Sequence, residues 1–381
     1  MEIAEPAHLG ESNEADDVFA PFPSVAYMGV SYLCNMKCDH CYALQQPRSR
    51  HLALDEVRKI IDDLSELFCC TLIFGHGEPF LYKDFFDVLR HAKSRGMNTV
   101  IMTNGTRIDE GIAERLTQPE YRPYRLYLSL DHYEEERHDR QRHVRGAYRG
   151  AIAAIKLLRS KGLDARISST INVSDPRPAE MWIKLCDELQ VPGISLLTIR
   201  NKQVHTKGQV LSYADVVREL VDWTIKRPDL EIMLHDPLIF RFVDAAKLPK
   251  PLYEKLYQEN RCTAGTERIA IQPDGTVTTC NLVDGPVLGN IRDKSIIDIW
   301  NDSPYLKRIQ GRHHAQSLSG CEQCHGYNEC RGGCPAFSTE SENDLVKDAR
   351  CRSLDAAPGQ EGAAPARAGA RKIDITISMK G

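Results

Sequence analysis

The stretch SYLCNMKCDHCYALQ, residues 31–45, carries Cys34, Cys38 and Cys41 with three and two residues between them. A structural zinc ion or a closed iron–sulfur cluster takes four ligands, and this loop offers three thiols. Three thiolates on a 4Fe–4S cube leave one iron open to a ligand that is not protein. A zinc site completed by His40 or by a distant residue is the alternative that the spacing leaves open.

The segments around this loop alternate between two patterns. From Ala26 onward, short runs of β-branched and aliphatic residues alternate with helical segments, whose apolar residues recur every three or four positions. The expected strands are residues 27–32, 70–74, 99–103, 124–130, 166–173 and 194–199. The first expected helix begins after Asp55. The other expected helices lie near residues 84–94, 109–117, 148–160, 178–190 and 214–227. This alternation predicts an α/β fold, a parallel sheet with right-handed crossovers.

The cysteine loop directly follows the first expected strand, because Cys34 comes two residues after Tyr32. In parallel α/β folds the carboxyl ends of the strands meet at one edge, and active sites lie there. We therefore expect the three thiols at the active-site edge of the sheet.

Composition narrows the classes of function. The chain has 381 residues and a net charge of −4, which does not favour general binding to nucleic acid or to an anionic membrane. No apolar run approaches the ~20 residues of a membrane span, and Met1–Gly10 lacks the features of a signal peptide. A cytoplasmic protein is expected, in which 13 cysteines indicate metal binding rather than disulfides.

The sequence divides into four predicted parts. Residues 1–22 are acidic and proline-containing, and we expect them to be disordered. Residues 23–227 carry the strand–helix alternation. Residues 228–354 form a linker and a cysteine-rich part, in which RIAIQPDGTVTTC (residues 268–280) predicts a hairpin on an Asp-Gly turn. Residues 355–381 are expected to be a flexible tail.

The cysteine loop after the first strand, together with a Gly77-Glu78-Pro79 turn after the second, resembles the radical S-adenosylmethionine (SAM) enzymes. The resemblance covers residues 24–225 and implies a partial (βα)6 TIM-like barrel. It also implies that the open iron binds the amino and carboxylate groups of SAM. Reductive cleavage then gives a 5′-deoxyadenosyl radical that abstracts a substrate hydrogen, so the fourth position would belong to the cofactor.

Further cofactor contacts follow from the same resemblance. In FGHGEP, the segment Gly77, Glu78 and Pro79 would hold the SAM amino group, and His76 replaces the first glycine of the family turn. MTNGT (residues 102–106) resembles the strand-three segment near the cofactor and contributes Asn104. LSLD (residues 128–131) resembles the strand-four segment that contacts polar groups of the cofactor. The residues carried over from it are Ser129 and Asp131.

Two more residues are assigned by position. Arg142, in HDRQR, lies where relatives place an arginine that faces the SAM carboxylate, and Arg140 is its rival. Tyr42 would line the adenine site. The alternatives are a plain strand serine for Ser129, a solvated surface for Arg142 and ordinary packing for Tyr42. No catalytic residue is expected beyond the cluster and the SAM site.

A second group of seven cysteines occupies the last third of the chain. Zinc ribbons are one interpretation, because seven thiols can serve two metal sites. The arrangement also resembles the SPASM domain of certain radical SAM enzymes, over residues 258–352, which implies two auxiliary 4Fe–4S clusters and three clusters in all. By resemblance, the ligands of the first auxiliary cluster are Cys262, Cys280 and Cys334. Those of the second are Cys321, Cys324, Cys330 and Cys351. The first is left open or is capped by a residue such as Glu267.

SPASM enzymes mostly modify peptides, so the resemblance implies maturation of a ribosomally made precursor peptide (a RiPP). The segment before the first strand is too short for a leader-binding winged-helix domain, which implies a separate leader-recognition protein or direct binding to the barrel rim. A flavodoxin- or ferredoxin-type protein would donate electrons. Asn281 replaces the aspartate base of sulfatase-maturating relatives and argues against that activity.

Two other functions compete with peptide maturation. One is a radical dehydrogenase or epimerase of an aminoglycoside or cyclitol, or an enzyme that modifies a haem precursor. The other is a non-enzymatic iron–sulfur scaffold, which would not need Glu78 or an open three-thiol loop. Outside the clusters, Cys69, Cys70 and Cys186 are interpreted as buried packing residues. The Arg- and His-rich residues 137–149 are interpreted as a solvated helix face, and the docking of an acidic leader is the alternative.

Overall fold

A computed structural model describes residues 22–43, 46–174, 176–199, 206–282, 287–307, 321, 327–337 and 348–355. Disorder was predicted for residues 1–22 and a flexible tail for residues 355–381; all of these except residues 22 and 355, and the predicted ligand Cys324, lie outside the described residues.

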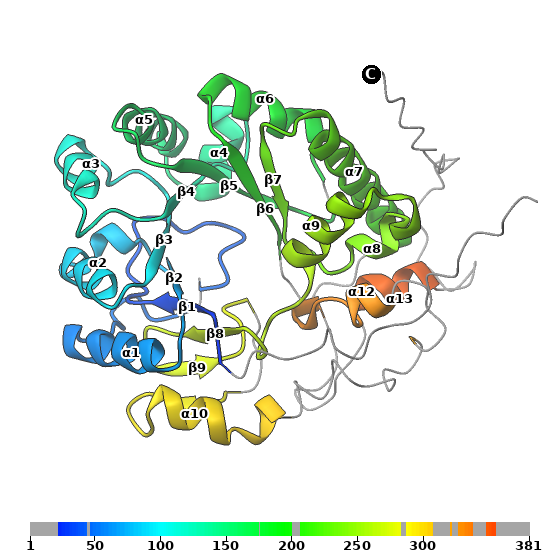
Figure 1. The fold of residues 1–381 in the computed structure, drawn as a ribbon. Coiled ribbons are helices and arrows are strands. Elements are labelled where there is room, and N and C mark those ends of the chain that lie inside the picture. Colours follow the sequence, from blue (N-terminus) through cyan, green and yellow to red (C-terminus); the bar gives the residue numbers. More distant parts are fainter. Residues whose placement is uncertain are drawn as a thin grey trace, which may run out of the picture.

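The described strands form one ten-stranded sheet that curves around a central space (Figure 1). Seven parallel strands follow one another in sequence order: β1 (Val25–Gly29), β2 (Thr71–Gly75), β3 (Asn98–Thr103), β4 (Arg125–Ser129), β5 (Ala165–Ile171), β6 (Gly193–Thr198) and β7 (Glu231–Leu234). On the other side of β1 lie β8 (Arg268–Ile271), which is parallel to it, and then the antiparallel strands β9 (Thr276–Thr278) and β10 (Gly289–Asn290). The C-terminal hairpin therefore extends the barrel sheet.

Helices cover the outer face of the curved sheet (Figure 1). The connections between the parallel strands contain α1 (Leu54–Glu66), α2 (Phe85–Ser94), α3 (Glu110–Thr117), α4 (Glu135–Arg142), α5 (Ala147–Ser160), α6 (Ala179–Leu189) and α7 (Lys207–Lys226), with the 3-10 turn η1 (Pro79–Leu81). After β7 come α8 (Ile239–Phe242), η2 (Ala245–Lys247), α9 (Lys250–Asn260), α10 (Ile296–Asp302), α12 (Tyr327–Cys330), η3 (Pro335–Phe337) and α13 (Ala349–Asp355).

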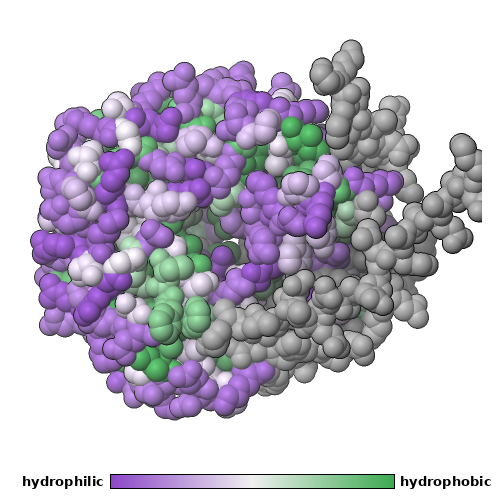
Figure 2. All heavy atoms as spheres, viewed as in Figure 1, coloured by the Kyte–Doolittle hydropathy of each residue, from purple (hydrophilic) through white to green (hydrophobic). Residues whose placement is uncertain are grey.

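The hydrophobic core lies between the sheet and these helices. In α1 the buried residues Val57, Ile60, Ile61 and Leu64 follow the helical period, so one apolar stripe faces the sheet. The strands supply the other half of the core through alternate residues such as Met28 and Phe74, both fully buried. Seen from the same side as the ribbon, the surface is mainly hydrophilic and is hollowed near its centre (Figure 2).

The inner face of the sheet surrounds a lumen. The Tyr127 hydroxyl on β4 donates to the sulfur of Met233 on β7 at 3.7 Å, and the two strands are not neighbours, so this contact crosses the barrel interior. Two residues earlier along each strand, Arg125 pairs with Glu231, and Arg166 joins Glu231 from β5. These ion pairs lie toward the amino ends of the strands and form the floor of the lumen.

The predicted fold class is confirmed, and the structure extends it. Each of the six predicted strands and six predicted helices overlaps an observed element, and the hairpin turns at Gly275, which has a positive φ of 85°. The repeat was expected to end near residue 228, but β7 continues the parallel order by one strand. It was missed because four residues with only two buried side chains give a weak period-two signal. In the described part of the chain, every helix is too short or too polar to span a lipid bilayer.

Candidate functional site

The three N-terminal cysteines lie in one packed loop between β1 and α1. Cys38 is buried with Met36, and the half-buried Cys34 and Cys41 pack against the same small cluster. The Arg48 guanidinium donates to the carbonyl oxygens of Cys34 and Met36, and this holds the loop in shape. None of the three thiols is in a disulfide.

Burial makes these thiols weak acids in the protein without a cluster. It raises the pKa of Cys38 to about 11, against the opposing charge of Arg142. It also raises the pKa of Cys34, and the hydrogen bond from the Met36 amide opposes this in part. Since metal ligands must be thiolates, cluster binding at this loop would release protons.

His40 does not join the thiols. Its Nδ1 lies 2.9 Å from the Gln141 side-chain nitrogen, and its Nε2 lies 3.9 Å from a carboxylate oxygen of Asp131. Among the described residues, no three His, Cys, Asp or Glu side chains are grouped to hold a single metal ion. His40 thus lies between Gln141 and the carboxylate of Asp131.

The turn after β2 brings a buried carboxylate against the cysteine loop. The Glu78 amide donates to the carbonyl oxygen of Leu33 at 2.8 Å. Gly77 has a φ of +57°, and a Cβ there would lie 2.4 Å from that same oxygen, so only glycine fits. His76 keeps the turn in place of glycine, because Gly29 leaves room for its ring. Pro79 then begins η1.

Glu78 itself is 1% exposed. Its carboxylate accepts hydrogen bonds from the Thr103 hydroxyl at 2.7 Å, the Asn104 amide at 2.8 Å and the Phe80 amide at 3.3 Å. Burial raises the pKa of Glu78, and these donors oppose the rise. A carboxylate has about four lone-pair positions, so one acceptor position is left for a ligand.

The turn after β3 is tied to the cysteine loop through side-chain amides. Asn104 donates to the Asn35 side-chain oxygen at 2.9 Å, and Asn35 donates to the Thr106 hydroxyl at 2.8 Å. Asn35 lies next to Cys34, so this turn and the cysteine loop form one hydrogen-bonded unit. Asn104 is buried, and its side chain faces the loop.

The segment after β4 supplies a buried ion pair. Asp131 accepts from Nε of Arg142 at 2.8 Å and also from its Nη2, and from the Thr170 amide and hydroxyl at 3.1 and 3.0 Å. Burial opposes ionisation of Asp131, but the charge of Arg142, with smaller contributions from His40 and His138, outweighs it and lowers the pKa of the carboxyl group. Ser129 ends β4 and shares the inner face with Tyr127 by strand alternation.

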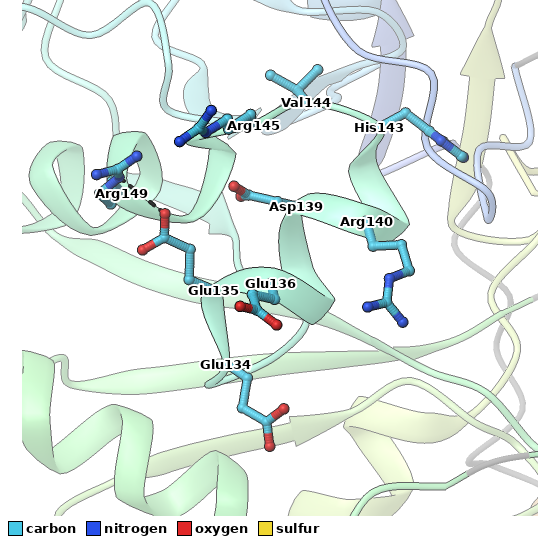
Figure 3. A pocket seen from close by; sticks show the side chains of 9 residues that line it. All are labelled: Glu134, Glu135, Glu136, Asp139, Arg140, His143, Val144, Arg145 and Arg149. Carbon is cyan, nitrogen blue, oxygen red and sulfur yellow. Dashed lines mark ion pairs between the residues drawn. The ribbon is translucent and has the colours of Figure 1, made fainter.

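The structure separates the two candidate arginines. Arg142 lies against Asp131, whereas Arg140 lines a surface hollow of about 940 Å³ beside α4 and α5. This hollow mixes both charge signs, and Glu135 and Arg149 pair across it at 3.0 Å (Figure 3). It contains none of the residues assigned to the cofactor or the clusters. Residues 137–149 were predicted to be a solvated helix face, but His138 and Arg142 within them are buried.

Tyr42 links the cysteine loop to the C-terminal hairpin. Its hydroxyl lies 3.2 Å from that of Tyr27 on β1, and it also interacts with the Asn281 side chain. Asn281 is next to Cys280, whose sulfur lies 3.8 Å from the Asn281 side-chain oxygen. Tyr42 is thus placed between the N-terminal loop and one of the C-terminal cysteines.

The C-terminal cysteines are mostly buried around the end of the barrel. Cys262 is half-buried just after α9, whereas Cys280, Cys321, Cys330, Cys334 and Cys351 are all buried. Cys334 and Cys351 are held on either side of Asp348, which accepts from the Cys334 amide with its side chain and from the Cys351 amide with its carbonyl oxygen. Glu267 pairs with Arg261.

Comparison with known families identifies two domains in the chain. The family model of the radical SAM superfamily matches residues 28–189, and that of the iron–sulfur cluster-binding SPASM domain matches residues 262–325. Together the two matches span more than half of the chain. The chain belongs to the radical SAM superfamily and carries a SPASM domain.

Individual relatives lie at low identity but high coverage. The AdoMet-dependent heme synthase of Oleidesulfovibrio alaskensis is 25% identical over 350 residues, 84% of this chain and 85% of that protein. The mycofactocin maturase MftC of Mycolicibacterium smegmatis is 26% identical over 313 residues, 81% of this chain and 76% of that protein. The crystal structure of Streptococcus suis SuiB bound to S-adenosylmethionine superposes with a TM-score of 0.67 at 20% identity, over 85% of this chain and 78% of that one.

The described residues of this radical SAM protein fit the cofactors that its family implies. The loop offers three thiols outside any disulfide, with a buried carboxylate beside it. Gly77 keeps the turn within hydrogen-bonding distance of the loop, in space that a Cβ would fill. Arg142 spends two of its five N–H donors on Asp131 and has others for a ligand carboxylate.

Some residues that shape this radical SAM site were not predicted. The cysteine loop is held by a hydrogen bond from the Arg48 guanidinium to the Cys34 carbonyl oxygen and by one from the Asn35 side chain to Thr106. A third hydrogen bond runs from the Asp39 amide to the carbonyl oxygen of Gln141. Asn35 lies between Cys34 and Cys38, so its position in the sequence could have indicated its role. Gln141 is about a hundred residues away from the loop, and no local pattern connects the two. One thiol was also misjudged: Cys69 and Cys186 are buried, but Cys70 is exposed, because neighbours in an extended segment point to opposite sides.

Proposed function

We propose that this protein binds a 4Fe–4S cluster at Cys34, Cys38 and Cys41, and S-adenosylmethionine beside it. When bound, the pair supplies a 5′-deoxyadenosyl radical that abstracts a hydrogen atom from the substrate. The convergence of the cysteine loop with the turns after β2, β3 and β4 supports this proposal. It brings thiols, a carboxylate and a guanidinium to one edge of the sheet.

The neighbouring residues then divide the work of holding the cofactor. Glu78 accepts a hydrogen bond from the SAM amino group, in a turn set by Gly77 and Pro79. Arg142, oriented by Asp131, pairs with the SAM carboxylate. The other contacts come from Asn104 and Ser129, at the carboxyl ends of β3 and β4, and from Tyr42 in the cysteine loop.

Two auxiliary 4Fe–4S clusters complete the proposed set of three. Cys262, Cys280 and Cys334 hold the first, and the ligands of the second are Cys321, Cys324, Cys330 and Cys351. Tyr42 and Asn281 lie between the N-terminal loop and Cys280, which supports an electron path between the SAM site and the first auxiliary cluster. A flavodoxin- or ferredoxin-type protein would supply the initial electron.

We infer that the substrate is a ribosomally made precursor peptide. The observation that carries this inference is the lumen, in which Tyr127 and Met233 meet above a floor of ion pairs. An apolar or aromatic side chain that enters from the open end would pack against these two residues. The similarity to a mycofactocin maturase supports the inference, as does the fold shared with SuiB, which has also been solved with its precursor peptide SuiA.

The test uses the anaerobically reconstituted protein with SAM and a strong reductant. The substrates are peptides encoded by short reading frames beside its gene, synthesised with deuterated side chains. Deuterium in the 5′-deoxyadenosine and a mass change in the peptide are expected. The Arg142→Lys variant should lose both the deuterium transfer and the change in peptide mass. The control variant Arg140→Lys, which changes an arginine of the surface hollow, should keep both. Turnover of SAM with no change in any peptide would refute the substrate class.

A haem precursor is the second candidate substrate. Arg268 on β8 pairs in register with Val25 and therefore shares the inner face with Tyr27. Its Nε is buried without a hydrogen-bond partner among the described residues, so it is available to a substrate carboxylate. The similarity to AdoMet-dependent heme synthases points the same way. Binding of iron coproporphyrin, followed by its Soret band and lost in Arg268→Met, would favour this candidate over the peptide.

A further inference from the structure

Three charged side chains outside the proposed SAM site are almost completely buried. Arg350 and Asp348 are each 0% exposed and Asp236 is 2% exposed. The Arg350 guanidinium donates to Asp236 Oδ1 at 2.9 Å, to Asp348 Oδ2 at 2.7 Å and to Asp348 Oδ1 at 3.1 Å. Such a group persists in a protein interior only when its charges and hydrogen bonds are matched.

The members of this triad come from two distant parts of the chain, Asp236 from the barrel and the pair Asp348 and Arg350 from the start of α13. Asp236 follows β7 at the rim of the barrel, where the Tyr213 hydroxyl on α7 donates to it at 2.6 Å. Arg350 lies in α13, one residue before Cys351, and its guanidinium stacks 3.7 Å above the ring of Phe337. The helix α13 packs against α7, so the triad lies where the C-terminal domain meets the barrel (Figure 1).

Asp348 connects the triad to the other cysteine segment. Its Oδ2 accepts from the Cys334 amide at 3.1 Å, and its own amide donates to the Gly332 carbonyl at 2.9 Å. A Cβ on Gly333 would lie 2.5 Å from the Cβ of Asp348, so this approach requires glycine. The Asp348 carboxylate thus contacts both the segment that carries Cys334 and Arg350, the residue just before Cys351.

We propose that Asp236, Arg350 and Asp348 are positioning residues that fix the two auxiliary-cluster segments to each other and to the barrel. This rests on the ligand assignment in the proposed function, in which Cys334 and Cys351 serve different clusters. Asp348 accepts from the Cys334 amide, and the guanidinium of Arg350, the residue before Cys351, joins Asp348 to Asp236 on the barrel. The triad also places two carboxylates against a single cation beside the ligands. Nearby negative charge lowers the reduction potential of an iron–sulfur cluster.

The first test is the substitution Arg350→Met in the reconstituted full chain. Loss of the guanidinium leaves two buried carboxylates that repel each other, and both cysteine segments should separate from the barrel. Iron per chain should fall by about two thirds, from about twelve to about four atoms. Reductive cleavage of SAM at the N-terminal loop should remain.

The second test is Asp348→Asn, which removes one charge and turns an N–H₂ group toward donors of this segment, while Arg350 keeps its pair with Asp236. The iron content should stay at the wild-type level, while the reduction potential of an auxiliary cluster, followed by electron paramagnetic resonance, should rise. A purely structural role would not move that potential. Glu231→Gln is the control, because it weakens the partly buried ion pairs at the opposite end of β7, and it should leave both iron content and potentials unchanged.

The outcomes separate this proposal from the one on which it rests. Wild-type protein that binds only about four irons refutes the assignment of Cys334 and Cys351 to clusters, and the positioning role with it. Wild-type protein with about twelve irons refutes the positioning role alone if Asp348→Asn leaves every potential unchanged. A folded Arg350→Met protein that keeps all its iron would also refute the positioning role alone.

Discussion

The buried pair of Asp131 and Arg142 gives a quantitative prediction for the variant Asp131→Asn. The two side chains are 1% and 8% exposed, so water screens their interaction little. Asparagine still has one oxygen to accept from Thr170, but it presents an N–H₂ group to the guanidinium of Arg142. A buried charge left without its partner costs about 3–5 kcal/mol, and the free energy of unfolding should fall by that amount.

The measurement is chemical unfolding of the cluster-free protein under reducing conditions, followed by circular dichroism. Glu254→Gln is the control, because it removes an ion pair with Lys250 whose side chains are 60% and 86% exposed. That change should stay within about 0.5 kcal/mol. The double variant Asp131→Asn/Arg142→Met should recover part of the loss, because it leaves no charge unpaired.

The same reasoning fixes the pH dependence. The pKa of Asp131 is lowered in the folded protein, so its contribution to stability is complete above the pKa of the unfolded chain. It disappears only as the pH falls through the still lower folded value. The difference between wild type and Asp131→Asn should therefore be constant between about pH 5 and pH 8. A loss below about 1 kcal/mol, or a difference that varies across this range, would refute the account of a buried, fully ionised pair.

Three further predictions concern single residues of the site. Burial lowers the pKa of His138 to about 4 from 6.5, so protonation of the unfolded chain should reduce stability as the pH falls between these values; His138→Asn should flatten that part of the unfolding profile. Gly77→Ala, whose Cβ would clash with the Leu33 carbonyl, should weaken SAM binding by at least about tenfold in calorimetry; wild-type affinity would contradict the close approach. Cys34→Ala should reduce bound iron by about four atoms per chain, whereas Cys186→Ala, which changes a buried packing residue, should not. Equal iron content in the two variants would contradict the assignment of Cys34 as a cluster ligand.

Local patterns were sufficient to predict most elements of the barrel. An amphipathic helix such as α1 is specified by residues three or four positions apart, and a hairpin by an Asp-Gly pair between two short apolar runs. The spacing of Cys34, Cys38 and Cys41 is local in the same sense, because these thiols share one loop. The strand β7 is too short to carry such a pattern, and its neighbours in the sheet reveal it.

The choice between Arg140 and Arg142 shows where local reasoning ends. Two residues that are two positions apart on a helix point to nearly opposite sides, so one of them had to face Asp131 and the other solvent. Which one did so depended on how α4 packs against the cysteine loop, through Gln141 and His40. The sequence contains both arginines in the same charged stretch and does not distinguish them.

The sequence alone predicted the α/β alternation from residue types at short, regular spacings, and its cysteine and Gly-Glu-Pro motifs supported the resemblance from which the family and the barrel were predicted. Only the tertiary structure decided which polar groups meet, such as Arg142 with Asp131, or Arg350 with Asp236 across 114 positions. The physical reason is that burial and long-range pairing set the energies of charged groups, and neither quantity is a property of neighbouring residues in the chain.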